Sequence, residues 1–147
     1  MTRFRFRLER VLAWRRTQLE IAEAAFQGQN AVAAELDRAR AALDAAGIRA
    51  EMTVRQWDRV TGGDLAALDA FRTDLQRRQT ALDAQRRAAR EQLEARRSAM
   101  LEARRRCRLL ERLKERRLAE WNAAVEREIE QLAGEMGVSS RRLAAGS

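Results

Sequence analysis

The chain of 147 residues contains no proline, no histidine and no tyrosine, and it has a single cysteine. The commonest helix breaker is therefore missing. With no histidine and one thiol, the sequence offers no histidine general base, no Cys–His pair and no Cys/His zinc site. We predict that the protein is not an enzyme, and we expect no cofactor, no metal and no small-molecule substrate. One cysteine also excludes an intrachain disulfide and suits a reducing compartment, so we expect a cytoplasmic protein.

Long apolar runs are missing as well. The longest stretch without a charge is Ala24 to Ala34, eleven residues, whereas a membrane-spanning helix needs about 20. The N-terminus alternates charged and uncharged residues from Thr2 to Leu8, so it has no apolar core of a secretory signal. The sequence predicts neither a membrane span nor secretion by the general route.

The residues that are present favour long helices over a globular core. Charged residues make up 35% of the chain and aromatic residues only 5%, while Ala, Leu, Arg, Glu and Gln, all strong helix formers, dominate most windows. From Leu8 to Trp57, apolar residues recur in alternating steps of four and three. Such a heptad repeat keeps one stripe facing a partner helix, as in a coiled coil. Its apolar members are Leu8, Leu12, Leu19, Ala22, Phe26, Ala33, Leu36, Leu43, Ala50, Val54 and Trp57, and Arg15, Gln29, Arg40 and Gly47 interrupt it.

A second stripe follows the glycine pair Gly62-Gly63. Near its end the spacing becomes eleven residues, which unwinds the left-handed supercoil. Its members are Leu68, Phe71, Leu75, Leu82, Ala89, Leu93, Met100, Ala103, Cys107 and Leu110, with Leu118, Trp121, Ile129 and Leu132 at the eleven-residue spacing. Cys107 lies on this stripe, so we expect a buried, inert thiol.

The segment Thr61-Gly62-Gly63-Asp64 is the one clear interruption, and Asp64 can cap the helix that follows. A short connection forces the two stripes to meet. We therefore predict an all-α fold, in which two long helices form an antiparallel coiled-coil hairpin and the second helix is longer. The predicted domain spans residues 1–137, with helix one over about 8–60, a turn at 61–64 and helix two over about 64–136. Residues 138–147 are predicted to be a flexible tail.

Basic residues concentrate between Gln85 and Arg117, where thirteen stand against five acidic ones. A basic helix can bind a phosphate backbone in a salt-dependent manner. Interspersed glutamates instead favour a solvated or protein-facing flank. We expect no nucleic-acid partner, and a nucleic-acid-binding basic coiled coil stays open as the alternative function.

Aromatic residues gather toward the ends of the predicted hairpin. Phe4, Phe6 and Trp121 lie toward the open end, and Trp57 and Phe71 flank the turn. Near the turn little mass is available to cover a large ring. Trp57 and Phe71 therefore have two open interpretations, a partner site or simple packing.

Taken together, the opening Phe4-x-Phe6-x-Leu8-x-x-Val11-Leu12-x-x-Arg15, the glycine break and the segment Asp64 to Phe71, with Leu75 and Gln79 after it, resemble the FliJ family of the bacterial flagellar export apparatus. This resemblance covers nearly the whole chain. It implies a coiled coil similar to the rotating stalk of F-type ATP synthases, non-enzymatic and active in type III protein export and hence in motility. The equivalent stalk of an injectisome is an alternative that the sequence leaves open.

The resemblance also implies the partners. The open end would insert into the hexameric export ATPase and promote its assembly, the hairpin end would bind the membrane export gate, and export chaperones are further candidates. Such a protein would be cytoplasmic and peripherally associated with the inner face of the cell membrane. The implied gate-binding residues are Val54, Trp57, Phe71, Leu75, Arg78 and Leu82. The residues expected to bind the ATPase, chosen mostly by location, are Phe4, Phe6, Leu8, Arg10, Leu12, Arg15, Leu118 and Trp121.

Overall fold

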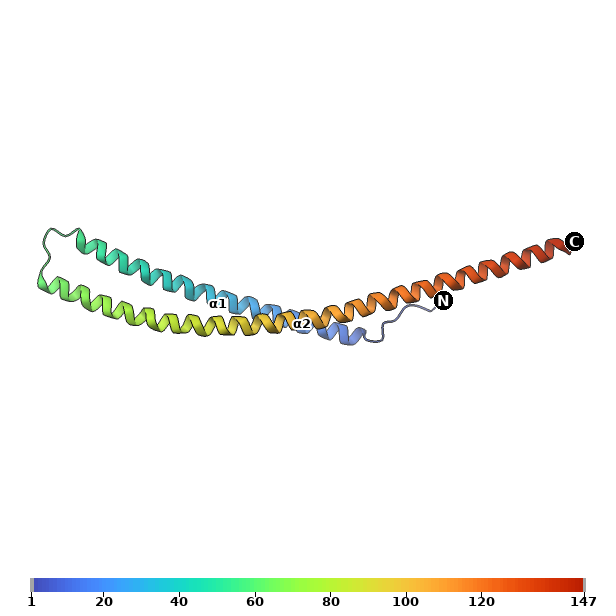
Figure 1. Ribbon diagram of the computed structural model, residues 1–147, viewed down its shortest axis with the longest axis horizontal. Coiled ribbons are helices and arrows are strands. Elements are labelled where there is room, and N and C mark those ends of the chain that lie inside the picture. The colour runs from blue at the N-terminus through green and yellow to red at the C-terminus, as the bar shows by residue number, and fades with distance from the viewer. Residues whose placement is uncertain (1, 147) are drawn as a thin grey trace. The chain divides into compact units, whose positions relative to one another are not determined.

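The computed structural model describes residues 2–146, which fold into two α-helices (Figure 1). Helix α1 spans Glu9–Arg55 and helix α2 spans Gly62–Ala145, and residues 2–146 contain no strand. The predicted all-α hairpin with a longer second helix is confirmed. Over the described residues, neither helix offers a stretch both long enough and apolar enough to cross a bilayer.

The chain divides into two compact units, which are described separately. One unit is Glu20–Glu102 and contains the connection between the helices; we call it the tip unit. The other contains the chain up to Leu19 and the chain from Ala103 onward, and we call it the terminal unit. In each unit, part of α1 packs against part of α2, because cross-helix hydrogen bonds and ion pairs join them.

The heptad positions of α1 form the packed side of the helix. All fifteen predicted positions except Trp57 are buried or half-buried, and Leu12 has no exposed surface. The polar residues that interrupt the apolar pattern also lie on this seam. In the tip unit, Gln29 donates a hydrogen bond from Nε2 to the carbonyl oxygen of Ala89 at 3.2 Å. A polar side chain on the seam is therefore tolerated because it bonds to the facing helix.

Charged residues of the tip unit join the helices at the middle of the seam. Arg40 donates from Nε to Asp83 at 2.9 Å, and Arg86 donates to Asp37 at 2.8 Å and to Asp83 at 3.2 Å. Arg40 also pairs with Asp44 on its own helix. Hydrogen bonds from Arg40, and then from Arg86, lower the pKa of Asp83, although partial burial opposes the shift. These five residues, here called the seam ion cluster, hold α1 and α2 in one alignment through directional bonds.

Gly47 also interrupts the heptad pattern, and close packing of the two helices accounts for a glycine at this position. A Cβ atom at this position would lie 2.7 Å from Cδ2 of Leu75 on α2, closer than two carbon atoms pack. Glycine therefore lets Leu75 lie directly against the backbone of α1. The helices approach closely at this level because one of them carries no side chain.

The connection between the helices differs from the predicted turn at 61–64. Helix α1 ends at Arg55 rather than near residue 60, and the connection comprises residues 56–61. Gly62 and Gly63 are the first two residues of α2, and no described glycine has a positive φ. The glycine pair does not make the turn, because a cap at Thr61 starts α2 before it.

The predicted flexible tail is also corrected. Helix α2 continues to Ala145, well beyond the expected end near residue 136. Gly134 and Gly137 lie within the helix, at a cost of about 1 kcal/mol each relative to alanine. Two isolated glycines among good helix formers did not end the helix.

Asp83 gives a test of the seam ion cluster. Because folding lowers its pKa, the Asp83 carboxylate stabilises the hairpin at neutral pH, and this contribution is lost as the pH falls below about 4. Asp83→Asn should lower the melting temperature at pH 7, as followed by circular dichroism. It should also make the melting temperature depend less on pH between neutral and acidic pH. Asp69→Asn, at an exposed position on the same helix, is the matched control. Equal effects of both substitutions would contradict a special role for Asp83.

Candidate functional site

A shallow groove lies beside the connection in the tip unit. Its volume is about 300 Å³, and both helix ends contribute to it. Trp57, in the connection, is 46% exposed, and Phe71, on the third turn of α2, is 40% exposed. The lining residues are Ala50, Thr53, Val54, Trp57, Asp64, Ala67, Leu68 and Phe71. We call this the tip groove; its two large rings keep much of their surface open to solvent, as a partner site requires.

Only part of the predicted gate-binding set belongs to the tip groove. Val54, Trp57 and Phe71 line it together. Leu75 instead packs against Gly47, and Leu82 is half-buried along the seam. Arg78 is exposed and pairs with Asp74 of its own helix at 3.1 Å. Leu75, Arg78 and Leu82 therefore lie on the seam or on the surface, outside the tip groove.

The sequence interpretation missed several residues of the tip groove. Ala50 and Leu68 lie on the predicted stripes, so their heptad positions gave a usable signal. Thr53 and Ala67 lie off the stripes, and no periodicity would have indicated them. Their contribution follows from the chain leaving the helix at Arg55, which uncovers the sides of both helix ends.

A reciprocal cap fixes one wall of the tip groove. The backbone N–H of Thr61 donates to Oδ2 of Asp64 at 2.9 Å, and the N–H of Asp64 donates to Oγ1 of Thr61 at 3.1 Å. This is a capping box, in which two helix-start donors are satisfied by each other's residues. The bond from the Thr61 N–H lowers the pKa of Asp64, so the carboxylate stays charged at neutral pH. Asp64 is thus the third residue of α2 rather than its cap, and it lines the groove from a fixed position.

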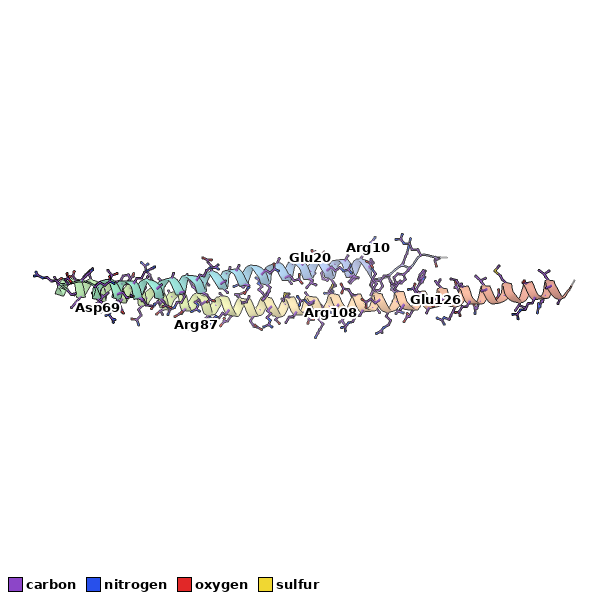
Figure 2. All side chains as sticks on the ribbon, turned by 90° about the horizontal axis from the view of Figure 1, so that it is seen from above. Arg10, Glu20, Asp69, Arg87, Arg108 and Glu126 are labelled. Carbon is purple, nitrogen blue, oxygen red and sulfur yellow. The ribbon has the colours of Figure 1, made fainter. Side chains whose placement is uncertain are left out.

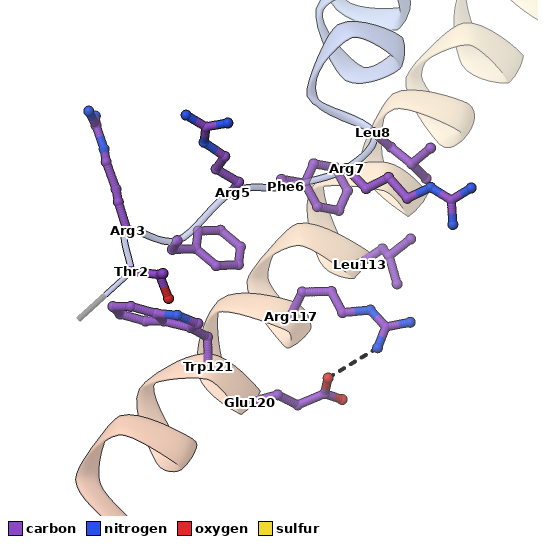
Figure 3. A pocket seen from close by; sticks show the side chains of 11 residues that line it. Thr2, Arg3, Arg5, Phe6, Arg7, Leu8, Leu113, Arg117, Glu120 and Trp121 are labelled. Carbon is purple, nitrogen blue, oxygen red and sulfur yellow. Dashed lines mark hydrogen bonds and ion pairs between the residues drawn. The ribbon is translucent and has the colours of Figure 1, made fainter. Parts of the chain in front are cut away.

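The N-terminal segment of the terminal unit packs against α2 in extended form (Figure 3). The rings of Phe4 and Trp121 lie with their centroids 6.0 Å apart, at an interplanar angle of 55°. In Figure 3 the side chains of Arg3 and Arg5 point away from α2. The hollow beside the segment measures about 700 Å³ and is lined by residues 2–8, Leu113, Arg117, Glu120 and Trp121. The alternation of charged and apolar residues noted in the sequence therefore gives an apolar side toward the helix and a basic side toward solvent.

The predicted ATPase-binding residues fall into three groups. Phe4, Phe6, Leu8 and Trp121 are brought together at the hollow just described. Leu12 is fully buried and is a core residue, so it has no surface for a partner. The others are Arg10, which is exposed, Arg15, whose guanidinium lies 4.8 Å from the ring centroid of Trp14, and Leu118, which is 38% exposed and does not line the hollow.

Cross-helix ion pairs extend through the terminal unit. Lys114 pairs with Glu9 at 2.9 Å, and Arg16 lies 3.5 Å from Glu111. One turn of α2 before Glu111, Cys107 is only 3% exposed, and burial raises the pKa of its thiol. The thiol is therefore protonated and weakly reactive at neutral pH. Elsewhere on α2, basic side chains such as Arg87 and Arg108 project into solvent (Figure 2).

Comparison with models of protein families, with curated proteins and with solved structures finds no match to this chain. Within residues 2–146, no cluster of three or more His, Cys, Asp or Glu side chains could hold a metal ion. The tip groove and the hollow beside the N-terminal segment each combine apolar and aromatic side chains with charged ones. Such surfaces are suited to binding protein partners.

Docking of the N-terminal segment can be measured through Trp121. In a Trp14→Phe, Trp57→Phe background, Phe4→Ala with Phe6→Ala should increase acrylamide quenching of Trp121. Each removed ring weakens docking by roughly 1 kcal/mol, because both are only half-buried. Arg3→Ala with Arg5→Ala is the control in the same segment, and it should leave quenching unchanged. If the arginine variant had the larger effect, charge rather than ring packing would hold the segment.

Proposed function

We propose that this chain is a non-enzymatic, stalk-like coiled coil of the flagellar type III protein export apparatus. It promotes assembly and activity of a hexameric export ATPase through its terminal unit, and it binds the membrane export gate through the tip groove. The equivalent role in an injectisome would use the same surfaces. In this role the protein works in the cytoplasm, peripherally at the inner face of the cell membrane, and export chaperones are further candidate partners.

One observation carries the proposal. The opening motif on which the FliJ resemblance depends is an ordered structural element: Phe4, Phe6 and Leu8 pack beside Trp121 on α2. The two helices of the hairpin do not need this N-terminal segment in order to pack against each other. Its packing leaves Arg3 and Arg5 exposed at the side, as a surface that contacts another protein would require.

The tip groove supports the second half of the proposal. Trp57 and Phe71 are large aromatic residues that remain 46% and 40% exposed, next to the half-buried aliphatic side chains of Val54 and Leu68. Aromatic anchors in an apolar groove dominate the free energy of many protein interfaces. The cap at Thr61 and Asp64 holds this groove in place before a partner binds, which lowers the entropy lost on binding.

The ATPase role is tested with purified proteins. Adding the chain to the export ATPase should raise both the rate of ATP hydrolysis and the fraction of hexamer measured by light scattering. Arg10→Glu should reduce the stimulation by roughly fivefold to tenfold, as expected for reversal of an interface charge. Arg49→Glu, an exposed charge reversal on α1 in the tip unit, is the control. No stimulation by the unmodified chain would refute this role.

The gate-binding role is tested at the tip groove. Trp57→Ala with Phe71→Ala should weaken binding to the cytoplasmic domain of the export gate by about tenfold or more, measured by titration calorimetry. Leu65→Ala is the matched control, because Leu65 is 56% exposed nearby on α2 and does not line the groove. Helicity and melting temperature should stay close to those of the unmodified chain. A large loss of melting temperature in the double variant would instead make both rings packing residues.

A further inference from the structure

An exposed tryptophan near the start of α1, in the terminal unit, belongs to neither of the two sites described above. Trp14 is 54% exposed and Val11, one turn before it, is 42% exposed, and neither residue lines the hollow or the tip groove. Arg10 and Trp14 stand two residues before and two residues after Leu12, which is fully buried. Because each residue advances the helix by about 100°, both side chains lie on the side of α1 opposite Leu12.

The charge on this part of the chain has one sign. Residues 2–19 contain six arginines and one glutamate. The glutamate, Glu9, pairs with Lys114 on α2, and Arg16 pairs with Glu111. Among the residues that the structure describes, the other five arginines have no carboxylate partner; they are Arg3, Arg5, Arg7, Arg10 and Arg15. An uncompensated positive surface of this kind attracts polyanions.

Several of these arginines lie where a partner can reach them. The side chains of Arg3 and Arg5 point away from α2 (Figure 3). The guanidinium of Arg15 lies 4.8 Å from the ring centroid of Trp14. A guanidinium stacked on an indole keeps N–H donors in its plane that can bind phosphate oxygens. We call these residues the Trp14 surface; its members are Arg3, Arg5, Arg10, Val11, Trp14 and Arg15.

This combination fits the headgroup region of an anionic bilayer better than it fits a nucleic acid. Tryptophan is enriched at membrane interfaces, and arginine can bind lipid phosphates while its apolar stem lies along the lipid. Val11 adds aliphatic surface, which a bilayer covers but on which no base stacks. A single-stranded nucleic acid binds where successive bases find open aromatic rings. The other rings of the terminal unit, Phe4, Phe6 and Trp121, are half-buried at the hollow instead.

We infer that the Trp14 surface binds the face of a bilayer that contains anionic lipids. Trp14 and Val11 lie at the level of the headgroups in this arrangement, and the arginines contact lipid phosphates. The inference does not rest on the proposed function, because its test contains neither the export ATPase nor the export gate. Arg10 also belongs to the surface proposed for the ATPase, so a bilayer and the ATPase would compete for the chain.

Co-sedimentation of the full chain with lipid vesicles tests the contact. The unmodified chain should bind vesicles of phosphatidylcholine and phosphatidylglycerol mixed about two to one, and it should not bind phosphatidylcholine alone. Arg3→Ala, Arg5→Ala and Arg10→Ala together should weaken binding to the mixed vesicles on the order of a hundredfold, since each arginine at the surface contributes about fivefold. Circular dichroism should show the same helicity as in the unmodified chain.

The matched control removes the same charge elsewhere in the terminal unit. Arg108→Ala, Arg112→Ala and Arg116→Ala change three exposed arginines of α2 outside the Trp14 surface, so they should weaken binding far less. An equal loss in both triple variants would show that net charge, and not this surface, holds the chain on the vesicles. Absence of binding by the unmodified chain, or equal binding to phosphatidylcholine alone, would also overturn the inference.

Fluorescence of Trp14 tests whether this side of α1 meets the lipid. In a Trp57→Phe, Trp121→Phe background, Trp14 is the one remaining tryptophan. Its emission should shift to shorter wavelength, and its quenching by acrylamide should fall, when the mixed vesicles are added. A single-stranded oligonucleotide or polyglutamate at the same salt concentration should change neither signal.

Two results of this measurement overturn the inference. Vesicle binding without a change in Trp14 emission would place the lipid contact elsewhere on the molecule. A response to the oligonucleotide or to polyglutamate as large as the response to vesicles would make a nucleic acid or an acidic protein the occupant.

Discussion

In each unit, the packing of α1 against α2 at heptad-spaced positions is the constraint on which the other features depend. The chain has few aromatic residues, and Leu12, Ala89 and Cys107 are the buried apolar residues among those described. Stability must therefore come from many half-buried side chains, each contributing a little, together with cross-helix hydrogen bonds. The tip groove and the docked N-terminal segment exist only because the seam first brings the two helices side by side.

Periodicity predicted the seam because burial in a helix pair repeats with a fixed step. Even the residues that broke the apolar pattern, such as Gln29, Arg40 and Gly47, lie on the seam, so position outweighed residue type. The ends of the elements were harder to predict. Competing local signals decide them: the Thr61–Asp64 capping box starts α2 ahead of the glycine pair, and strong helix formers carry α2 through Gly134 and Gly137.

The candidate sites were predicted less completely than the fold. Phe4 and Trp121 share one site in the terminal unit, and Trp57 and Phe71 share another in the tip unit. Leu12 and Leu75 proved to be packing residues, because a stripe residue near a helix end has the same sequence signature whether it is covered or open. A stripe residue is covered only if the facing helix reaches its level. How far that helix reaches depends on the connection and on the N-terminal segment.

The seam ion cluster also limits how the helices of the tip unit can move. An apolar seam with a regular repeat has several nearly equivalent alignments, each one heptad from the next. Here a slip of one heptad in either direction would carry Arg40 from Asp83 to the level of Arg90 or of Gln76. The first alignment sets two cations together, and the second leaves Asp83 without Arg40. Within the tip unit, the seam ion cluster therefore opposes longitudinal sliding of α1 along α2, because any such slip separates Asp83 from Arg40.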